Sequence, residues 1–221
     1  ETRNAPPPFA HARHLCYTPP CIYNAPESAG MAPPTRTIHQ TEHFDRIGMV
    51  ARWQPVHRGH VPVLRALCDR ASQALIGIGS SNRHDLRNPF TLEERTDMVR
   101  LALGERTNYA LIPVPDLDDG PRWREMVVDL FGSLDLFVTD NPYVTSLLTD
   151  SYKTIKPVEL VPKDERIAVN GSMVRKEMAR GDDWRALVPE EISDYITAGH
   201  LDERFRREFG LQTLAMDTIV K

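Results

Sequence analysis

The feature that most constrains this chain is a regular alternation, from residue 46 onwards, of short apolar runs with segments of helical period. The apolar runs predict strands at 46–52, 74–79, 109–114, 134–139 and 157–161. The other segments predict helices at 60–72, from Thr91 onwards, and at 122–131, 142–149, 172–180, 189–198 and 201–208. Because parallel strands separated by helices need right-handed crossovers, we expect an α/β fold with a doubly wound parallel sheet and C-terminal helices.

The first 42 residues differ in composition from the rest of the chain. Eight of the 18 prolines lie before residue 35, and no apolar period runs through this stretch. Proline lacks a backbone N–H and fixes φ, so the segment can form neither a helix nor the interior of a sheet. We therefore expect a Pro-rich disordered extension over 1–42 and one folded domain over 43–221. A Pro-rich ligand for a partner domain is the alternative for the extension.

Composition also excludes several classes of protein. The formal net charge of −4 over 221 residues gives no basic excess for nucleic acid, although a local anion site is compatible with it. No apolar run approaches the roughly 18 residues of a membrane span, and the N-terminus lacks the pattern of a secretory signal. Cys16, Cys21 and Cys68 form neither a disulfide framework nor a zinc-site pattern, so we expect a cytoplasmic protein.

Polar side chains gather between the first strand and the first helix, in segment 52–60. This turn directs the free N–H groups of the helix toward the crevice where such folds bind ligands. His57 and His60 are three residues apart and can reach one side of the turn, and Arg52 ends the strand there. Gly59 has no side chain, which lets a phosphate approach the backbone. The segment predicts a polyphosphate site; a metal site is the alternative, but no third ligand stands at a recognisable spacing.

Five blocks of sequence then resemble one known family. Their patterns are G-R-x-Q-P-x-H-x-G-H, I-G-S with N/D-P-F-T-x-x-E-R, I-P-x-x-D with a following Trp, S-G-N-P and S-G-T/S-x-x-R. They lie at Ala51–His60, at Ile78–Ser80 with Asn88–Arg95, at Ile112–Asp116 with Trp123, at Thr139–Pro142 and at Asn170–Arg175. In this order the blocks resemble the nucleotidyltransferase superfamily with the H-x-G-H signature, and within it the archaeal-type nicotinamide-nucleotide (NMN) adenylyltransferases.

The resemblance implies a Rossmann-like nucleotidyltransferase fold and an enzyme that transfers AMP from ATP to NMN, giving NAD and pyrophosphate. It implies catalytic roles for His57, His60, Arg52 and Arg175. It implies ATP binding by Gly59, Gly79, Asn141, Pro142, Gly171, Ser172 and Arg175, and NMN binding by Arg87, Asp116 and Trp123. The quaternary state stays open, although such relatives are often homo-oligomers.

The reaction explains why this site would be rich in hydrogen-bond donors. The phosphate nucleophile is largely ionised at pH 7, since its second pKa is about 6, and so needs no strong general base. The protein must instead align two polyanions and neutralise charge, for which we expect Mg2+ as cofactor, with no side chain assigned as its ligand. If Ser172 caps its helix, Arg175 and Lys176 lie in the first turn, where a cation is unfavourable unless an anion binds beside it.

Several residues keep alternative interpretations. Trp123 is either a core aromatic or a ring that stacks on nicotinamide, and Arg87 is either a solvated loop residue or a phosphate ligand. Gly77 and Gly79 are expected to let the chain turn beside a nucleotide.

The chain also departs from the family pattern at Ala51, Gly120, Thr139-Asp140 and Asn170. Gly120 stands where close relatives carry Asn, which predicts looser discrimination between nicotinamide and nicotinate forms of the acceptor. These departures leave two alternatives open. One is a related transferase with another phosphorylated acceptor, such as nicotinate mononucleotide, and the other is a non-catalytic, nucleotide-binding regulator.

Overall fold

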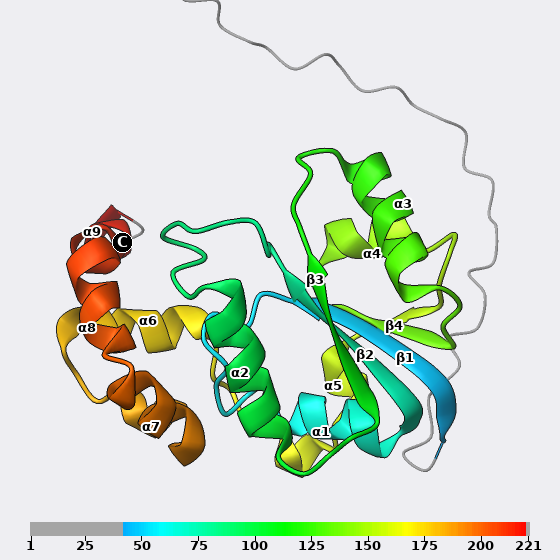
Figure 1. The fold of residues 1–221 in the computed structure, drawn as a ribbon, viewed down its shortest axis with the longest axis horizontal. Coiled ribbons are helices and arrows are strands. Elements are labelled where there is room, and N and C mark those ends of the chain that lie inside the picture. Colours follow the sequence, from blue (N-terminus) through cyan, green and yellow to red (C-terminus); the bar gives the residue numbers. More distant parts are fainter. Residues whose placement is uncertain (1–41, 220–221) are drawn as a thin grey trace, which may run out of the picture. The chain divides into compact units, whose positions relative to one another are not determined.

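The computed structural model describes residues 42–219, which form a parallel sheet with helices on both of its faces (Figure 1). The strands are β1 (Phe44–Ala51), β2 (Ala71–Gly79), β3 (Tyr109–Val114), β4 (Leu136–Val138) and β5 (Thr154–Ile155). They lie in the order β3-β2-β1-β4-β5, and every neighbouring pair is parallel. The predicted doubly wound α/β fold is therefore confirmed. The extension predicted for 1–42 lies, apart from Glu42, outside the described residues.

Helices follow nearly every strand and continue beyond the sheet. Their bounds are α1 (Val61–Asp69), α2 (Leu92–Leu103), α3 (Gly120–Phe131), α4 (Pro142–Leu148), α5 (Pro157–Leu160), α6 (Gly171–Arg180), α7 (Glu190–Ala198), α8 (Leu201–Phe205) and α9 (Leu211–Ile219). In the part of the chain that the structure describes, no helix has the length and apolar character to cross a membrane.

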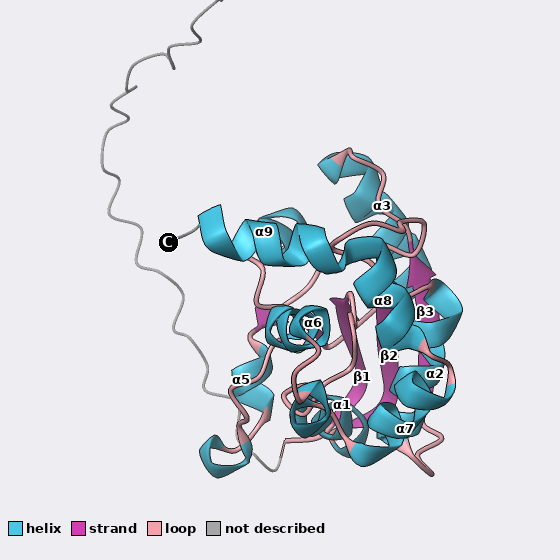
Figure 2. Cartoon of the chain, turned by 90° about the vertical axis from the view of Figure 1, so that its left-hand side faces the viewer, coloured by secondary structure: helices cyan, strands magenta, loops and turns pink. Residues whose placement is uncertain are grey.

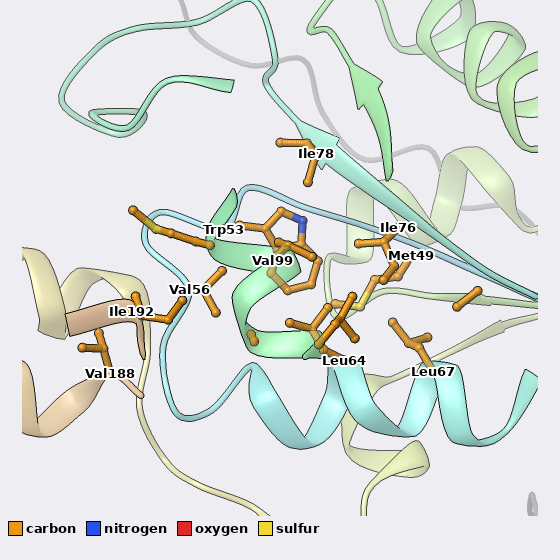
Figure 3. Close-up of a cluster of buried hydrophobic side chains, with 14 of the residues drawn as sticks. Met49, Trp53, Val56, Leu64, Leu67, Ile76, Ile78, Val99, Val188 and Ile192 are labelled. Atoms are coloured by element: carbon orange, nitrogen blue, oxygen red, sulfur yellow. The ribbon is translucent and has the colours of Figure 1, made fainter. Parts of the chain in front are cut away.

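Two hydrophobic clusters cover the two faces of the sheet, as the alternation of side chains along each strand requires. On one face β1, β2 and β4 pack against α1, α2 and the C-terminal helices, with Met49, Leu64 and Val99 among the buried residues (Figure 3). On the other face α3 and α4 cover a smaller cluster that includes Phe131 and Phe137. In Figure 1, α3 and α4 lie above the sheet and α1, α2 and α5 below it.

The prediction of a strand at 157–161 is wrong. The last strand is the two-residue β5, and residues Pro157–Leu160 form the short helix α5. Pro157 has the fixed φ that suits a first helical turn, and the Glu159 carboxylate accepts a hydrogen bond of 2.8 Å from the Lys156 N–H. An apolar run of this length fits a strand or a buried helical turn equally well, and the local capping selects the helix.

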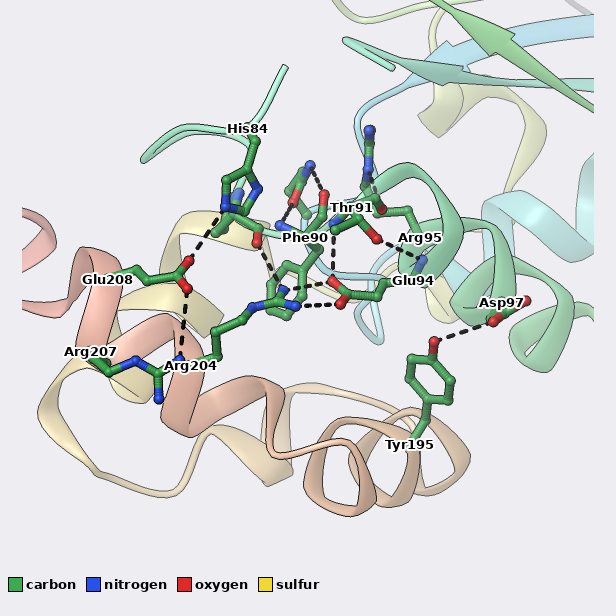
Figure 4. Close-up of polar contacts among 12 residues, drawn as sticks. His84, Phe90, Thr91, Glu94, Arg95, Asp97, Tyr195, Arg204, Arg207 and Glu208 are labelled. Atoms are coloured by element: carbon green, nitrogen blue, oxygen red, sulfur yellow. Dashed lines mark hydrogen bonds and ion pairs between the residues drawn. The ribbon is translucent and has the colours of Figure 1, made fainter. Parts of the chain in front are cut away.

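The C-terminal helices α6–α9 lie beyond the carboxyl ends of the strands (Figures 1 and 2). The Arg204 guanidinium of α8 donates to both carboxylate oxygens of Glu94, at 2.5 and 2.7 Å, and Tyr195 of α7 donates to Asp97 at 3.3 Å (Figure 4). Glu94 also completes the predicted capping box of α2 with Thr91. The single helix predicted at 201–208 is instead α8 followed by a π-helical turn at Arg206–Gly210.

Candidate functional site

A cavity of about 830 Å³ opens at the carboxyl ends of β1 and β4. The chain runs from β1 outward through β2 to β3 and then returns to place β4 on the other side of β1. Strand order reverses at this point, which is where open α/β sheets bind ligands. Fourteen residues of the cavity wall stand at positions that the sequence singled out: Ala51, Arg52, His57, Gly59, His60, Gly79, Ser80, Asp116, Gly120, Trp123, Thr139, Asp140, Asn141 and Asn170.

The loop from β1 to α1 is held in place by two buried side chains. The Gln54 amide makes a two-way bond with the backbone of Phe90, donating to its carbonyl at 3.0 Å and accepting from its N–H at 2.9 Å. Trp53, which is buried, adopts a positive φ of 55° and donates from its indole to the Gly77 carbonyl at 2.9 Å. These bonds fix the backbone that carries His57 and His60.

His57 and His60 are brought together as predicted. Their rings are stacked, with centroids 3.5 Å apart and planes 23° from parallel. Burial, and next to it the charge of Arg175, lowers the pKa of His57 to about 4. Burial, and next to it His57, lowers the pKa of His60 well below its usual value. Both imidazoles are therefore neutral at pH 7, and each offers one N–H donor rather than a full positive charge.

Each of these histidines also has a buried, unused polar atom. The Nδ1 atoms of His57 and His60 are buried and have no hydrogen-bond partner within the described chain. An unsatisfied buried polar atom usually costs 1–3 kcal/mol or more, so such atoms need a reason. Here both belong to residues of the cavity wall, which is the arrangement expected when a ligand completes the hydrogen bonds.

The prediction that Ser172 caps α6 is wrong. The N-cap is Asn170, whose side chain accepts a hydrogen bond of 3.0 Å from the Met173 N–H. Arg175 consequently lies in the second turn, so the argument from a cation in the first turn does not apply to it. Its guanidinium instead folds back and donates to the Gln54 carbonyl at 2.6 Å and to the Ser172 hydroxyl at 3.2 Å. This bond joins α6 to the loop that carries the histidines.

Two guanidiniums lie close to the histidines. Burial, and next to it the charge of Arg52, lowers the pKa of Arg175 to about 10, so Arg175 remains charged at pH 7. Arg52 itself is exposed on the cavity wall. Two like charges this close repel each other unless an anion lies between or beside them. The pair supplies, beside the histidines, the positive charge that the neutral imidazoles lack.

Gly59 has a packing role that the sequence did not show. A Cβ atom on Gly59 would lie 2.6 Å from the Val169 carbonyl oxygen and 2.9 Å from that of Ile167. The missing side chain therefore makes room for the segment before α6, and the approach of a phosphate to the Gly59 backbone stays a prediction. Likewise Gly77 and Gly79 are strand residues rather than a turn, and a Cβ on either would meet Val50 at 2.7 or 3.1 Å.

We expect Gly59→Ala to destabilise the protein by about 1–3 kcal/mol, because backbone oxygens of a packed segment cannot yield to the new methyl group. Chemical denaturation of the variant measures this loss. Gly210→Ala is the matched control, since a Cβ there meets its nearest neighbour, Arg206, at 3.8 Å. Equal stability of Gly59→Ala and Gly210→Ala would contradict the close approach of the 167–169 segment.

Another part of the cavity wall is acidic and aromatic. Trp123, on the first turns of α3, is half-buried and lines the cavity, which supports the ligand-contacting alternative over a fully buried core residue. Asp116 lies on the same wall and is joined to the β2–α2 loop by a two-way bond between its backbone and the Asn82 side chain, at 2.8 and 2.9 Å. Asp118 and Asp119 follow on the same wall.

Five sequence-predicted residues do not line this cavity: Arg87, Pro142, Gly171, Ser172 and Arg175. Arg87 is exposed in the β2–α2 loop. Pro142 starts α4 behind Asn141, which does line the cavity and caps that helix. Gly171 lets α6 approach the loop between β1 and α1, since a Cβ on Gly171 would lie 2.7 Å from the Gln54 carbonyl oxygen. These residues of α6 do not line the cavity but support the loop that carries the histidines: Gly171, Ser172 and Arg175.

Sequence reasoning missed a buried cation beneath the site. Arg95 of α2 is fully buried and donates to the carbonyls of Gly79, Arg52 and Ser80, at 2.6, 2.9 and 3.3 Å. It thereby ties the ends of β1 and β2 to α2. Its position inside the second motif block was the available signal, but a helical pattern with charged neighbours did not distinguish it from an exposed residue.

Tyr143 and Arg166 were also missed. Both line the cavity, and neither stands inside one of the five motif blocks. Arg166 is anchored by bonds to the carbonyls of Val161 and Val158, at 3.1 and 2.5 Å.

Comparisons with known proteins agree with this geometry. A family model described as cytidylyltransferase-like matches residues 49–182, a span that contains the end of β1 and every residue of the cavity wall. The chain belongs to the cytidylyltransferase-like family. This family member is 37% identical to a nicotinamide-nucleotide adenylyltransferase of Methanococcus vannielii, over 68% of this chain and 87% of that protein. It is 33% identical to one of Pyrococcus furiosus, over 71% of this chain and 85% of that protein.

Solved structures support the cytidylyltransferase-like fold. A bifunctional NMN adenylyltransferase/ADP ribose pyrophosphatase of Francisella tularensis superimposes with a TM-score of 0.64 at 15% identity, over 79% of this chain. The match covers 55% of that chain, so this protein spans about half its length. A structure of the Francisella protein with AMP and manganese matches with a TM-score of 0.55. At these identities the likeness concerns the fold alone.

Proposed function

We propose that this protein is a nicotinamide-nucleotide adenylyltransferase, which transfers AMP from ATP to NMN and releases pyrophosphate. The observation that carries the proposal is a single cavity with two chemically different walls. One wall presents His57, His60 and Arg52, and the other presents Trp123. We further propose that residues 43–221 form the catalytic domain, with 1–42 as an extension to it. The named relatives in Methanococcus and Pyrococcus support the same activity.

In this proposal, the histidine wall binds the triphosphate of ATP. Each neutral imidazole donates one N–H to a phosphate oxygen, and Arg52 supplies positive charge beside them. Arg175 does not line the cavity. It holds the histidine loop through its hydrogen bond to the Gln54 carbonyl, and its positive charge adds to that of Arg52. Preorganised donors aimed at developing charge are worth most where water is largely excluded, and His57 is 5% exposed.

The attacking group needs little activation by the protein. The NMN phosphate is largely ionised at pH 7 and is already a nucleophile, so no side chain must remove a proton from it. Its oxygen forms a bond to the α-phosphorus of ATP, and the bond to the β-phosphate oxygen breaks, with pyrophosphate leaving. The protein's contribution is to align the two phosphates and reduce their repulsion.

The described residues also fit a divalent cation brought in with ATP. Within residues 42–219, no group of three or more His, Cys, Asp or Glu side chains is arranged to hold a metal ion. Mg2+ commonly takes one or two carboxylates together with substrate phosphates and water, and Asp140 on the cavity wall is an available carboxylate. When bound, Mg2+ would neutralise charge on the triphosphate. The manganese in the related Francisella structure supports a metal of this class.

Purified protein with ATP, NMN and Mg2+ should form NAD and release pyrophosphate. The measurement is chromatography of the dinucleotide product, with nicotinate mononucleotide and other phosphorylated acceptors assayed in parallel. Pyrophosphate release with another acceptor, but not with NMN, would favour a related transferase. Binding of ATP without pyrophosphate release from any acceptor would favour the non-catalytic regulator.

We expect Trp123→Ala to raise KM for NMN about three- to tenfold and to leave KM for ATP nearly unchanged. Stacking of an aromatic ring on the pyridine contributes roughly 0.5–1.5 kcal/mol beyond its burial, and the truncation removes it. Steady-state kinetics with each substrate varied in turn measures both constants. Because Trp123 is half-buried, the thermal midpoint of the variant must be measured beside them. A change in KM for ATP alone would place Trp123 on the adenosine side.

A further inference from the structure

The start of α3 and the start of α4 meet at one edge of the cavity. Helices α3 and α4 lie side by side in Figure 1 and pack against each other. Gly120 is the first residue of α3, and Tyr143 follows the first residue of α4. Both residues line the cavity, and Gly120 lies three residues before Trp123 on α3. The two helix starts therefore frame the side of the cavity to which we assign the acceptor ring.

Tyr143 occupies the space that a side chain at position 120 would take. A Cβ atom built on Gly120 would collide with the Tyr143 hydroxyl oxygen and would lie 3.2 Å from the Leu147 side chain. The Tyr143 side chain is 61% exposed, although it is a large aromatic residue. A large aromatic side chain that stays exposed on a cavity wall is expected where a ligand covers it.

The Tyr143 hydroxyl is also a suitable polar group beside the start of α3. Pro121 has no N–H, and the Arg122 N–H is already bonded to Asp119 at 3.0 Å, so these two residues of the helix start offer no free backbone donor. A phenolic hydroxyl can both donate and accept. No hydrogen bond of the Tyr143 hydroxyl occurs among the described residues.

The cavity that Tyr143 lines also carries several carboxylates. Asp116, Asp118, Asp119 and Asp140 all line the cavity. Arg83 pairs with Asp118 and lies 3.7 Å from Asp116, which offsets only part of that charge. A carboxylate on the acceptor ring would be repelled here, whereas a neutral carboxamide would not.

We propose that Tyr143, with Gly120 making room for it, is a specificity-determining residue that binds the ring substituent of the acceptor mononucleotide. Together with the acidic wall, it selects the neutral carboxamide of the nicotinamide form over the carboxylate of the nicotinate form. This inference rests on the function proposed above and deepens it. It reverses the expectation of loose discrimination drawn from Gly120 alone, because the space beside that glycine is filled by a different side chain.

The test compares Tyr143→Phe, Gly120→Ala and the double variant with the unmodified protein. Tyr143→Phe removes only the hydroxyl, and Gly120→Ala displaces it, so each should raise KM for NMN about three- to tenfold with KM for ATP unchanged. The double variant should lose no more than either single one, since both act on one hydroxyl. Tyr109 is the first residue of β3 and does not line the cavity. Tyr109→Phe is therefore the control for loss of a hydroxyl and should behave as the unmodified protein.

The same assays measure discrimination. The unmodified protein should prefer NMN over nicotinate mononucleotide by at least about tenfold in kcat/KM, and Tyr143→Phe should lower that preference. If the protein makes dinucleotide but Tyr143→Phe keeps KM for NMN within twofold, this assignment is wrong and the proposed function stands. Calorimetric titration with each mononucleotide provides the second readout. A protein that binds neither mononucleotide and makes no dinucleotide overturns the proposed function together with the role of Tyr143.

Discussion

His60→Ala should lower kcat about 10²–10³-fold and change KM for ATP much less. The neutral imidazole would donate to a phosphate oxygen whose charge grows as pyrophosphate leaves, so the bond strengthens mainly in the transition state. Loss of such a bond reduces kcat and kcat/KM together. Steady-state kinetics with ATP varied at saturating NMN measures this effect.

Two controls separate catalysis from folding in this experiment. His60 stacks on His57 and lies edge-on to Trp53 at 4.8 Å, so its removal also changes packing, and the thermal midpoint of His60→Ala must be recorded. His43→Ala is the matched control, because His43 is an exposed residue just before β1. A kcat for His60→Ala within twofold of the unmodified protein would make His60 a structural residue only.

The free energy of unfolding should fall steeply as the pH drops from about 6.5 towards 4. Burial lowers the pKa of His57 to about 4 in the folded protein, whereas an unfolded histidine titrates near 6.5. Between these values the unfolded state binds a proton that the folded state does not, so folding is disfavoured as pH falls. A difference of this size corresponds to a loss on the order of 3 kcal/mol from His57 alone. His60 acts in the same direction.

Urea denaturation at a series of pH values from 7 to 4.5 measures this loss. Other groups also titrate in this range, so the comparison that isolates the pair is between the unmodified protein and His57→Asn/His60→Asn. The double variant should have a shallower slope, by up to about 1.4 kcal/mol per pH unit for each histidine removed. A bound polyphosphate favours the protonated imidazoles, so ATP should reduce the slope of the unmodified protein. Equal slopes with and without the two histidines would contradict their burial in neutral form.

The sequence by itself determined the fold and pointed to segments that line the cavity. The strand predicted at 109–114 coincides with β3, and the one predicted at 74–79 covers the last six of the nine residues of β2. Those six residues of β2 are all buried, and a strand buried on both faces leaves a continuous apolar run. The capping box at Thr91 and Glu94 is confirmed for a similar reason, since a helix start is a local structure fixed by two side chains. The loop after β1 was identified because its glycine and histidines are adjacent in sequence.

Only the tertiary structure decided what each of these residues touches. Gly59 is needed by the carbonyls of residues more than 100 positions later, and Arg175 bonds to Gln54 across a separation of 121 residues. The burial that makes the two imidazoles neutral and the contact between Gly120 and Tyr143 likewise depend on packed elements that are distant in sequence. Local sequence patterns reflect backbone propensity and which side of an element is buried. The charge state of the histidines, the close contacts of the glycines and the residues that line the cavity depend instead on which elements pack together.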